Sequence, residues 1–208
     1  DTLDDSYELI PTAKTMKPYQ IAIFFSGNER SLASSKFNMR VDECRSAAYA
    51  LKAFADMDYG KFEETHLREV PREVYEQYKH KLPQNWSDRA EHWYTEFARA
   101  EQGATAWKNG DLDLFGKLSF QSGHSSVYNY KTGSDELKTI YEIMTRTDGI
   151  YGGRFSGAGF NGCCMALIDP SYQESILHTV QQEYLKIFPH LKEKYSAAIC
   201  HSADGVIL

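Results

Sequence analysis

The sequence predicts an α+β fold in which helices cover an antiparallel sheet of the split βαβ type, with a helical subdomain inserted. Short β-favouring runs occur once near residue 20, as a pair within 151–169, and again near residue 197, with helical periodicities between them. The run 163–169 is apolar on both faces, which is typical of a strand in the middle of a sheet. The order strand, helices, strand, strand, helix, strand therefore favours one mixed domain.

The first part of the chain predicts a strand followed by a helix. Residues 20–25 form an apolar, β-favouring run that ends at a Ser-Gly-Asn turn, and residues 7–10 could form a weaker strand before it. From Asn38 apolar residues recur every three or four positions, which predicts an amphipathic helix ending near Gly60. The residues that set this period are Val41, Cys44, Ala48, Leu51 and Phe54.

The middle of the chain predicts three further helices. A short helix fits between Pro71 and Pro83, and a long one follows with Asn85 as its N-cap. We interpret the apolar stripe of the long helix as a packed seam rather than a ligand cage. Residues 109–111 end this helix and cap the next one, so the two should form an antiparallel hairpin. The stripe consists of Trp86, Ala90, Trp93, Phe97, Ala100, Ala104 and Trp107.

The last third predicts the rest of the sheet and two covering helices. Ser134 caps a helix that precedes the strand pair 151–156 and 163–169. A capping box from Ser171 to Glu174 should open the final helix, and a strand near 197–200 should follow, with a possible short one at 206–208. The inward residues of the final helix are expected to be Ile176, Val180, Tyr184 and Ile187.

Composition indicates an ordinary soluble globular protein. The 208 residues are 42% hydrophobic and 25% charged, with a net charge of −6. This acidic balance argues against nucleic acid and polybasic membrane surfaces, so small molecules and proteins remain as partners. No apolar run of about eighteen residues and no signal-peptide pattern occurs. We expect a cytoplasmic protein whose four cysteines are reduced.

Several common catalytic motifs are absent. The seven histidines form no HExxH or other ligand spacing, so we expect no metal site within this chain, and GxSxG and Walker A sequences are missing. We interpret Glu91, His92 and Glu96 as ordinary charges on an exposed helix face. His124 lies within a run of small residues, 122–126, that we interpret as a break between helices.

The glycine-rich stretch 152–164, between the paired strands, carries the strongest functional signal. Its tip, Ser156, Gly157, Ala158, Gly159 and Phe160, offers several backbone N–H groups with little side-chain cover, which suits an anion such as a phosphate. The alternative is a hairpin that needs glycine only for its turn geometry. Composition alone leaves both interpretations open.

Four segments in the same order resemble the GHMP kinases, in their galactokinase-like form. The glycine stretch is similar to the third conserved motif of that family, and the other segments are similar to its lobe-joining segment, its Gly-Asp helix pair and its C-terminal ending. The resemblance covers nearly the whole chain. The matching segments are GRFSGAGFNGC at 153–163, SLASSKFNMRVDEC at 31–44, WKNGDLDLFGKL at 107–118 and SADG at 202–205.

The resemblance implies the C-terminal half of an ATP-dependent sugar 1-kinase, with a ferredoxin-like sheet. Residues 1–30 would be the end of the N-terminal lobe and its joining strands, and 31–208 the C-terminal domain. The resemblance also implies that the glycine tip lies near the transferred phosphate. It places the catalytic base upstream of Asp1, so this chain would contain no catalytic residue. ATP and Mg²⁺ would be bound mainly by the N-terminal lobe of the same protein, which would be its partner.

Some residues point to a particular branch of the family. The segments 122–126, 129–130 and 133–134 and the pair Cys163-Cys164 look more like galacturonokinases than galactokinases. Phe37 stands where galactokinases usually have a tyrosine that faces the sugar, so the sugar itself stays open between galactose and galacturonate. The alternative function is a non-catalytic, galactokinase-like sensor or binding protein.

Overall fold

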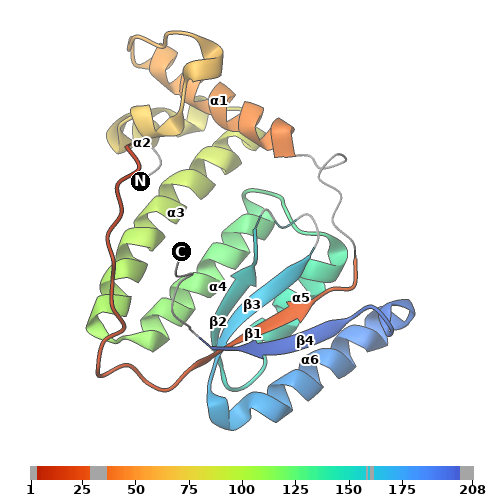
Figure 1. The fold of residues 1–208 in the computed structure, drawn as a ribbon. Helices are drawn as coiled ribbons and strands as arrows, with labels where there is room; N and C mark the ends of the chain where they lie inside the picture. The colour runs from red at the N-terminus through yellow and green to blue at the C-terminus, as the bar shows by residue number, and fades with distance from the viewer. Residues whose placement is uncertain (1–3, 29–36, 158, 160–161, 202–208) are drawn as a thin grey trace.

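The computed structural model describes residues 4–28, 37–157, 159 and 162–201. A four-stranded sheet and several helices form one side of the molecule, and a group of helices extends from it (Figure 1). The strands are β1 (Gln20–Phe25), β2 (Ile150–Phe155), β3 (Cys163–Ile168) and β4 (Ser196–Cys200), and the α-helices are α1 (Phe37–Phe54), α2 (Arg72–Tyr78), α3 (Gln84–Asn109), α4 (Leu112–Tyr128), α5 (Asp135–Thr145) and α6 (Gln173–Ile187).

The sheet has the order β2-β3-β1-β4, and all three of its strand pairs are antiparallel. The predicted split βαβ plan is therefore confirmed. Strand β3 lies between β2 and β1, as its apolar character on both faces predicts. The glycine stretch connects β2 to β3 directly, so it lies at the tip of a hairpin in the sheet.

One hydrophobic core lies between the sheet and helices α5 and α6. Alternate residues of the strands, such as Phe24 and Ile168, face this core together with Ile140 of α5 and Val180 of α6. Tyr184 closes one side of it, because its buried hydroxyl donates a hydrogen bond to the Ser26 carbonyl at 2.6 Å. The core thereby fixes the end of β1 beside the final helix.

Helix α4 packs against β2 through two glycines. A Cβ on Gly152 would lie 2.0 Å from the Gly116 carbonyl oxygen, and a Cβ on Gly116 would lie 2.1 Å from the Tyr151 carbonyl oxygen. The two backbones therefore touch, and no side chain fits between them. Gly152, at the start of the glycine stretch, serves this packing.

The helices α1, α2 and α3 enclose a second core. Ala48 and Leu51 of α1 pack with Tyr75 of α2 and with Ala90 and Tyr94 of α3. Helix α3 continues from this cluster to α4, and the two helices run side by side (Figure 1). The helical part and the sheet are therefore joined through the α3–α4 hairpin.

Most predicted elements are present, with boundaries shifted by a few residues. Asp111 and Ser134 cap α4 and α5 as predicted, since their side chains accept hydrogen bonds from the backbone N–H groups of Leu114 and Leu137. The predicted strand at 7–10 is wrong, because this segment has no strand partner in the described structure. The possible strand at 206–208 lies outside the described residues.

Three local predictions for α3 and α4 are wrong or only partly right. Helix α3 begins directly after Pro83, so Asn85 is inside the helix and is not its N-cap. The apolar stripe of α3 is only partly packed against other helices, because Phe97 and Ala100 are exposed. His124 lies within the continuous helix α4 and not in a break. The small residues beside it serve packing, since a Cβ on Gly123 would lie 2.4 Å from the Tyr141 ring.

Two predictions for the last helix are also wrong. The Ser171 hydroxyl donates to the Asp169 carboxylate, so the predicted capping box with Glu174 does not form, and α6 begins at Gln173. Ile187 is exposed at the end of α6, where the helix runs past the core. Within the described ranges no helix has the length and apolar character needed to cross a membrane.

Candidate functional site

The glycine loop between β2 and β3 adopts a backbone that requires glycine. Gly157 and Gly159 have φ values of +77° and +76°, in the left-handed region. Gly157 is exposed, with no atom within 4 Å of the place a Cβ would take. The hairpin is closed by a hydrogen bond from the Ser156 N–H to the Cys163 carbonyl at 2.9 Å. The described part of the loop thus presents bare backbone at a fixed hairpin tip.

Gly159 is packed against the turn that follows α4. A Cβ at this position would lie 2.7 Å from the Phe155 ring and 3.3 Å from the Thr132 hydroxyl. Thr132 is itself fixed, since both its N–H and its hydroxyl donate to the Ser126 carbonyl. The conformation of the glycine loop is therefore supported from outside the hairpin by the 129–134 turn.

A buried ion group joins this turn to α1 and α3. The Glu43 carboxylate accepts hydrogen bonds from Arg40 at 2.9 Å and from Arg89 at 2.6 Å, and Arg89 is only 1% exposed. Both arginines also donate to backbone carbonyls of the turn, Arg40 to Lys131 and Arg89 to Asn129. The two guanidinium groups share one carboxylate, and their further hydrogen bonds to the turn carbonyls help them to remain buried.

Phe37 is the first residue of α1 and its side chain is 45% exposed. The same helix carries Arg40 and Glu43, which contact the turn that supports Gly159. The structure therefore ties the helix that begins at Phe37 and the glycine loop to one common turn. Of the predicted loop residues, Ser156, Gly157 and Gly159 are described, and Ala158 and Phe160 lie outside the described residues.

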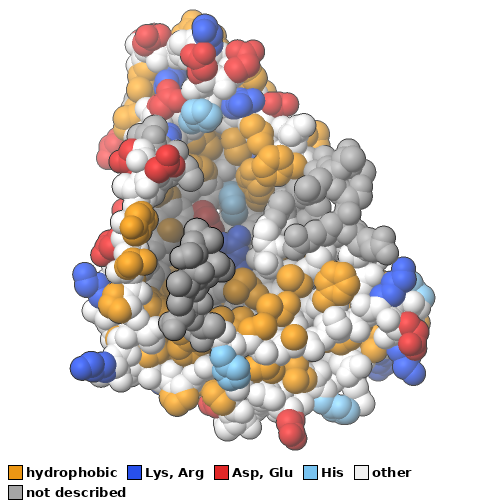
Figure 2. Space-filling model, viewed as in Figure 1, with side chains coloured by type: hydrophobic (Ala, Val, Ile, Leu, Met, Phe, Trp, Pro, Cys, Tyr) orange, Lys and Arg blue, Asp and Glu red, His pale blue; other side chains and the backbone are white. Residues whose placement is uncertain are grey.

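A second polar group, on α3, contradicts the prediction of an exposed charged face. Glu96 accepts hydrogen bonds from Ser122 of α4, from Arg99 and from Arg154 of β2. Arg154 comes just before the glycine loop, so this group connects α3 and α4 to the strand that leads into it. Figure 2 shows a hollow between the helical part and the sheet, with charged and histidine side chains inside it.

His92 and Glu96 have pKa values that reflect this partly buried setting. Burial lowers the pKa of His92 to about 4, although the charge of Glu96 opposes the shift. Burial would raise the pKa of Glu96, but hydrogen bonds from Ser122 and Arg99 and the charge of Arg154 outweigh it, so this pKa is lowered. At neutral pH the pair is therefore a neutral imidazole and a carboxylate.

The sequence does carry a signal for these residues that an apolar stripe search misses. Arg89, His92, Glu96 and Arg99 follow one another at steps of three and four residues, which places them on one face of α3. His92 contacts the Ser125 hydroxyl at 2.9 Å. The spacing places these polar residues on one face, but the same spacing is common on solvated helix faces, so it does not by itself predict their burial.

We expect His92 to make stability depend on pH. The ordinary histidine pKa of 6.5 applies to the unfolded chain and about 4 to the folded one, so the unfolded state binds more protons and stability falls as pH drops from about 6.5 to about 4. In His92→Gln the free energy of unfolding, measured with urea across this range, should change less with pH. The control His178→Gln alters an exposed histidine of α6 and should keep the wild-type slope. Equal slopes in both variants would rule out this role of His92.

The described residues contain no group of three or more histidine, cysteine or acidic side chains placed to hold a metal ion. Cys164 is fully buried, and burial raises the pKa of its thiol well above the ordinary value. The described part of the glycine loop exposes backbone at Gly157, and the 129–134 turn packs against Gly159.

The chain is similar to sugar kinases. A family model described as "GHMP kinases C terminal" matches residues 103–186. The chain is 38% identical to a galacturonokinase of Arabidopsis thaliana over 98% of its own length and 48% of the relative's, and 30% identical to a galactokinase of Roseiflexus sp. over 99% and 50%. It thus spans about half the length of these curated relatives.

A solved structure extends the similarity to three dimensions. The crystal structure of Lactococcus lactis galactokinase complexed with galactose superposes with a TM-score of 0.78 at 26% identity, covering 93% of this chain and 47% of that one. The fold of nearly all of this chain therefore corresponds to about half of that protein.

Proposed function

Because this chain carries the C-terminal domain of the GHMP kinase family, we propose that it is the C-terminal half of an ATP-dependent sugar 1-kinase of the galactokinase or galacturonokinase type. The whole enzyme would phosphorylate the anomeric hydroxyl of a galactose-like sugar. Residues 31–208 form the C-terminal domain, and residues 1–30 join it to the N-terminal half while contributing β1 to the sheet.

The glycine loop is the observation that carries this proposal. Phosphoryl transfer depends mainly on positioning and on stabilising charge at the phosphate oxygens. Backbone N–H groups of residues 157–159 would donate to those oxygens, since Gly157 leaves the approach open and the packing of Gly159 against Thr132 fixes the loop. A preorganised loop needs little rearrangement when a phosphate arrives.

The other parts of the active site belong to the N-terminal half. We assign to it the catalytic base, the second phosphate-binding loop and most contacts to Mg²⁺. ATP supplies the phosphoryl group, and the C-terminal half supplies one wall of the site. We propose that Phe37 lies beside the sugar. A phenylalanine there offers no hydroxyl to hydrogen-bond, so the preference between galactose and galacturonate must be measured.

We expect the full-length protein to release ADP with ATP, Mg²⁺ and a sugar, and the 208 residues alone to release none above background. Galactose, galacturonate and glucuronate should be compared in a coupled ADP assay, with the product identified as a sugar 1-phosphate by phosphorus NMR. Turnover by the isolated 208 residues would refute the division of the site between two halves. A full-length protein that binds one of these sugars but transfers no phosphate would instead be the sensor.

A further inference from the structure

Arg154 is the last residue but one of β2, and its side chain joins this strand to α3. Its Nη1 atom donates to the Oε1 atom of Glu96 at 3.2 Å, and the two side chains are 38% and 28% exposed. The two residues before it, Gly152 and Gly153, have no side chains that could reach α3. The strand ends one residue later, and the Ser156 N–H then closes the hairpin. A movement of Arg154 is therefore passed directly to the first residues of the glycine loop.

Glu96 is held in place by groups other than Arg154. Its Oε2 atom accepts hydrogen bonds from the Nε and Nη2 atoms of Arg99 at 3.1 and 2.8 Å, and its Oε1 atom accepts from the Ser122 hydroxyl of α4. Arg99 is fixed in turn, because its Nη2 atom also donates to the Thr95 hydroxyl at 2.9 Å. Helices α3 and α4 thus set the position of the carboxylate, and Arg154 reaches an acceptor that is already in place. A charge-assisted hydrogen bond of this kind fixes geometry as well as adding energy.

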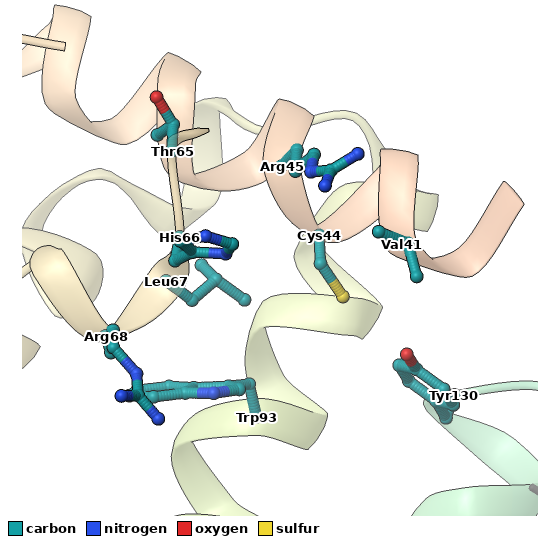
Figure 3. Close-up of a pocket in the computed structure, with 9 residues that line it drawn as sticks. All are labelled: Val41, Cys44, Arg45, Thr65, His66, Leu67, Arg68, Trp93 and Tyr130. Carbon is teal, nitrogen blue, oxygen red and sulfur yellow. The ribbon is translucent and has the colours of Figure 1, made fainter. Parts of the chain in front are cut away.

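Packing alone does not fix the Arg154 side chain. A cavity of about 210 Å³ lies beside it, and its lining includes Arg154, Glu96 and the small residues Gly103 and Ala104 of α3. Space of this size lets a long side chain adopt other rotamers, so the hydrogen bond to Glu96 selects one of them. A larger pocket of about 470 Å³ lies between α1, the 65–68 segment and α3 (Figure 3), and it shares none of its described lining residues with this cavity. The larger pocket therefore plays no part in holding Arg154.

The end of β2 is held from its other face by Phe155. Successive residues of a strand point to opposite faces of the sheet, and Phe155 belongs to the core beneath the sheet. Its ring lies close to the backbones of Gly133 and Gly159. One side chain on each face, Phe155 toward the core and Arg154 toward α3, thus determines the direction in which the backbone enters the glycine loop.

We propose that Arg154 is a positioning residue for phosphoryl transfer, because its hydrogen bond to Glu96 sets the direction of the glycine loop and so aims the N–H groups of Gly157 and Gly159. The inference rests on the proposed function for the reaction that the loop serves. The coupling between Glu96 and the loop is a property of this chain with or without that reaction. An ion pair as exposed as this one contributes little to stability, so its loss should change the loop more than the fold.

Selective ¹⁵N-glycine labelling of the full-length protein, without ligands, lets NMR observe the loop directly. The amide signals of Gly157 and Gly159 are assigned from Gly157→Ala and Gly159→Ala. We expect Arg154→Gln and Glu96→Ala each to move both signals, because each change removes the same hydrogen bond. The double variant should move them no further than the larger of the two single changes, since the two residues act as one unit.

Two further variants separate positioning from stability. Arg154→Lys keeps the charge and a donor, so it should move the glycine signals less than Arg154→Gln does. Arg146→Gln breaks another exposed arginine–glutamate pair, between α5 and α6, and should leave both signals in place. The melting temperature of Arg154→Gln should fall by less than about 4 °C, as expected for an exposed pair. A larger fall would assign the pair to stability, and unmoved signals in folded Arg154→Gln would overturn the coupling.

Steady-state kinetics test the consequence for the reaction. In the ADP assay, kcat of full-length Arg154→Gln should fall at least about tenfold while KM for the sugar changes less than about twofold, the pattern of an interaction that acts in the transition state. Arg154→Lys should recover part of kcat, and Arg146→Gln should keep all of it. Moved glycine signals with an unchanged kcat would overturn the positioning role. If the wild-type protein transferred no phosphate, the proposed function would fail, and the glycine signals would still decide whether Arg154 is coupled to the loop.

Discussion

Replacing Gly159 by valine in the full-length protein should lower kcat about 100-fold or more, the loss found when one preorganised hydrogen-bond donor is removed from a catalytic site. The valine Cβ would lie 2.7 Å from the Phe155 ring, and a β-branched residue strongly disfavours the φ of +76°. The loop must therefore change its backbone, which would turn its N–H groups away from the position proposed for the phosphate. The ADP assay with the preferred sugar measures the loss.

Two controls separate this effect from general strain. Gly60→Val places the same residue at a φ of +55° on an exposed turn with no neighbour within 4 Å, so it should keep full activity. Gly157→Ala introduces positive-φ strain without a clash, and its effect on kcat should be intermediate. If folded Gly159→Val retained wild-type kcat, the glycines of this loop would serve turn geometry alone.

The glycine stretch shows how far the sequence reaches in predicting this site. Its position between two strands follows from local patterns, and the structure confirms the hairpin. The different roles of its glycines do not follow, because Gly152 is required by contact with Gly116, a residue far away in the sequence. The composition therefore predicts where the loop is. It does not distinguish a glycine that lets α4 pack against the sheet, such as Gly152, from a glycine that leaves backbone exposed, such as Gly157.

Local capping rules succeeded where no neighbour competed for the capping side chain. Asp111 and Ser134 cap their helices as predicted. The predicted capping box from Ser171 to Glu174 does not form, because the Asp169 carboxylate accepts hydrogen bonds from both the N–H and the hydroxyl of Ser171. Asp169 thereby caps a short 3₁₀ helix, Pro170–Tyr172, that precedes α6. The same residue types allow both arrangements, and the turn after Pro170 decides between them.

The polar network of the helical part was the least predictable feature. Charges on a helix are usually solvated, so Glu96 and Arg89 read as surface residues in isolation. Their burial depends on α4 and on the turn after it, which supply Ser122 and the Asn129 carbonyl. These partners come from a tertiary arrangement that single-helix periodicity does not contain.

Glu43→Ala should lower the free energy of unfolding by about 3 to 5 kcal/mol, because removing one partner of a buried ion group leaves uncompensated charge inside the protein. Arg40 and Arg89 both donate to this carboxylate, and their side chains are only 7% and 1% exposed. Urea unfolding of the 208-residue chain at neutral pH measures the loss.

The matched control and a conservative variant give this prediction its specificity. Glu64→Ala removes an exposed carboxylate that pairs with Lys61 and should cost under about 1 kcal/mol, as surface ion pairs do. Glu43→Gln keeps an acceptor oxygen without the charge, so its loss should fall between the two. A loss under about 1 kcal/mol in Glu43→Ala would mean that the arginines reach water when the carboxylate is removed. The turn that supports Gly159 would then depend on its own hydrogen bonds to Ser126, not on α1 and α3.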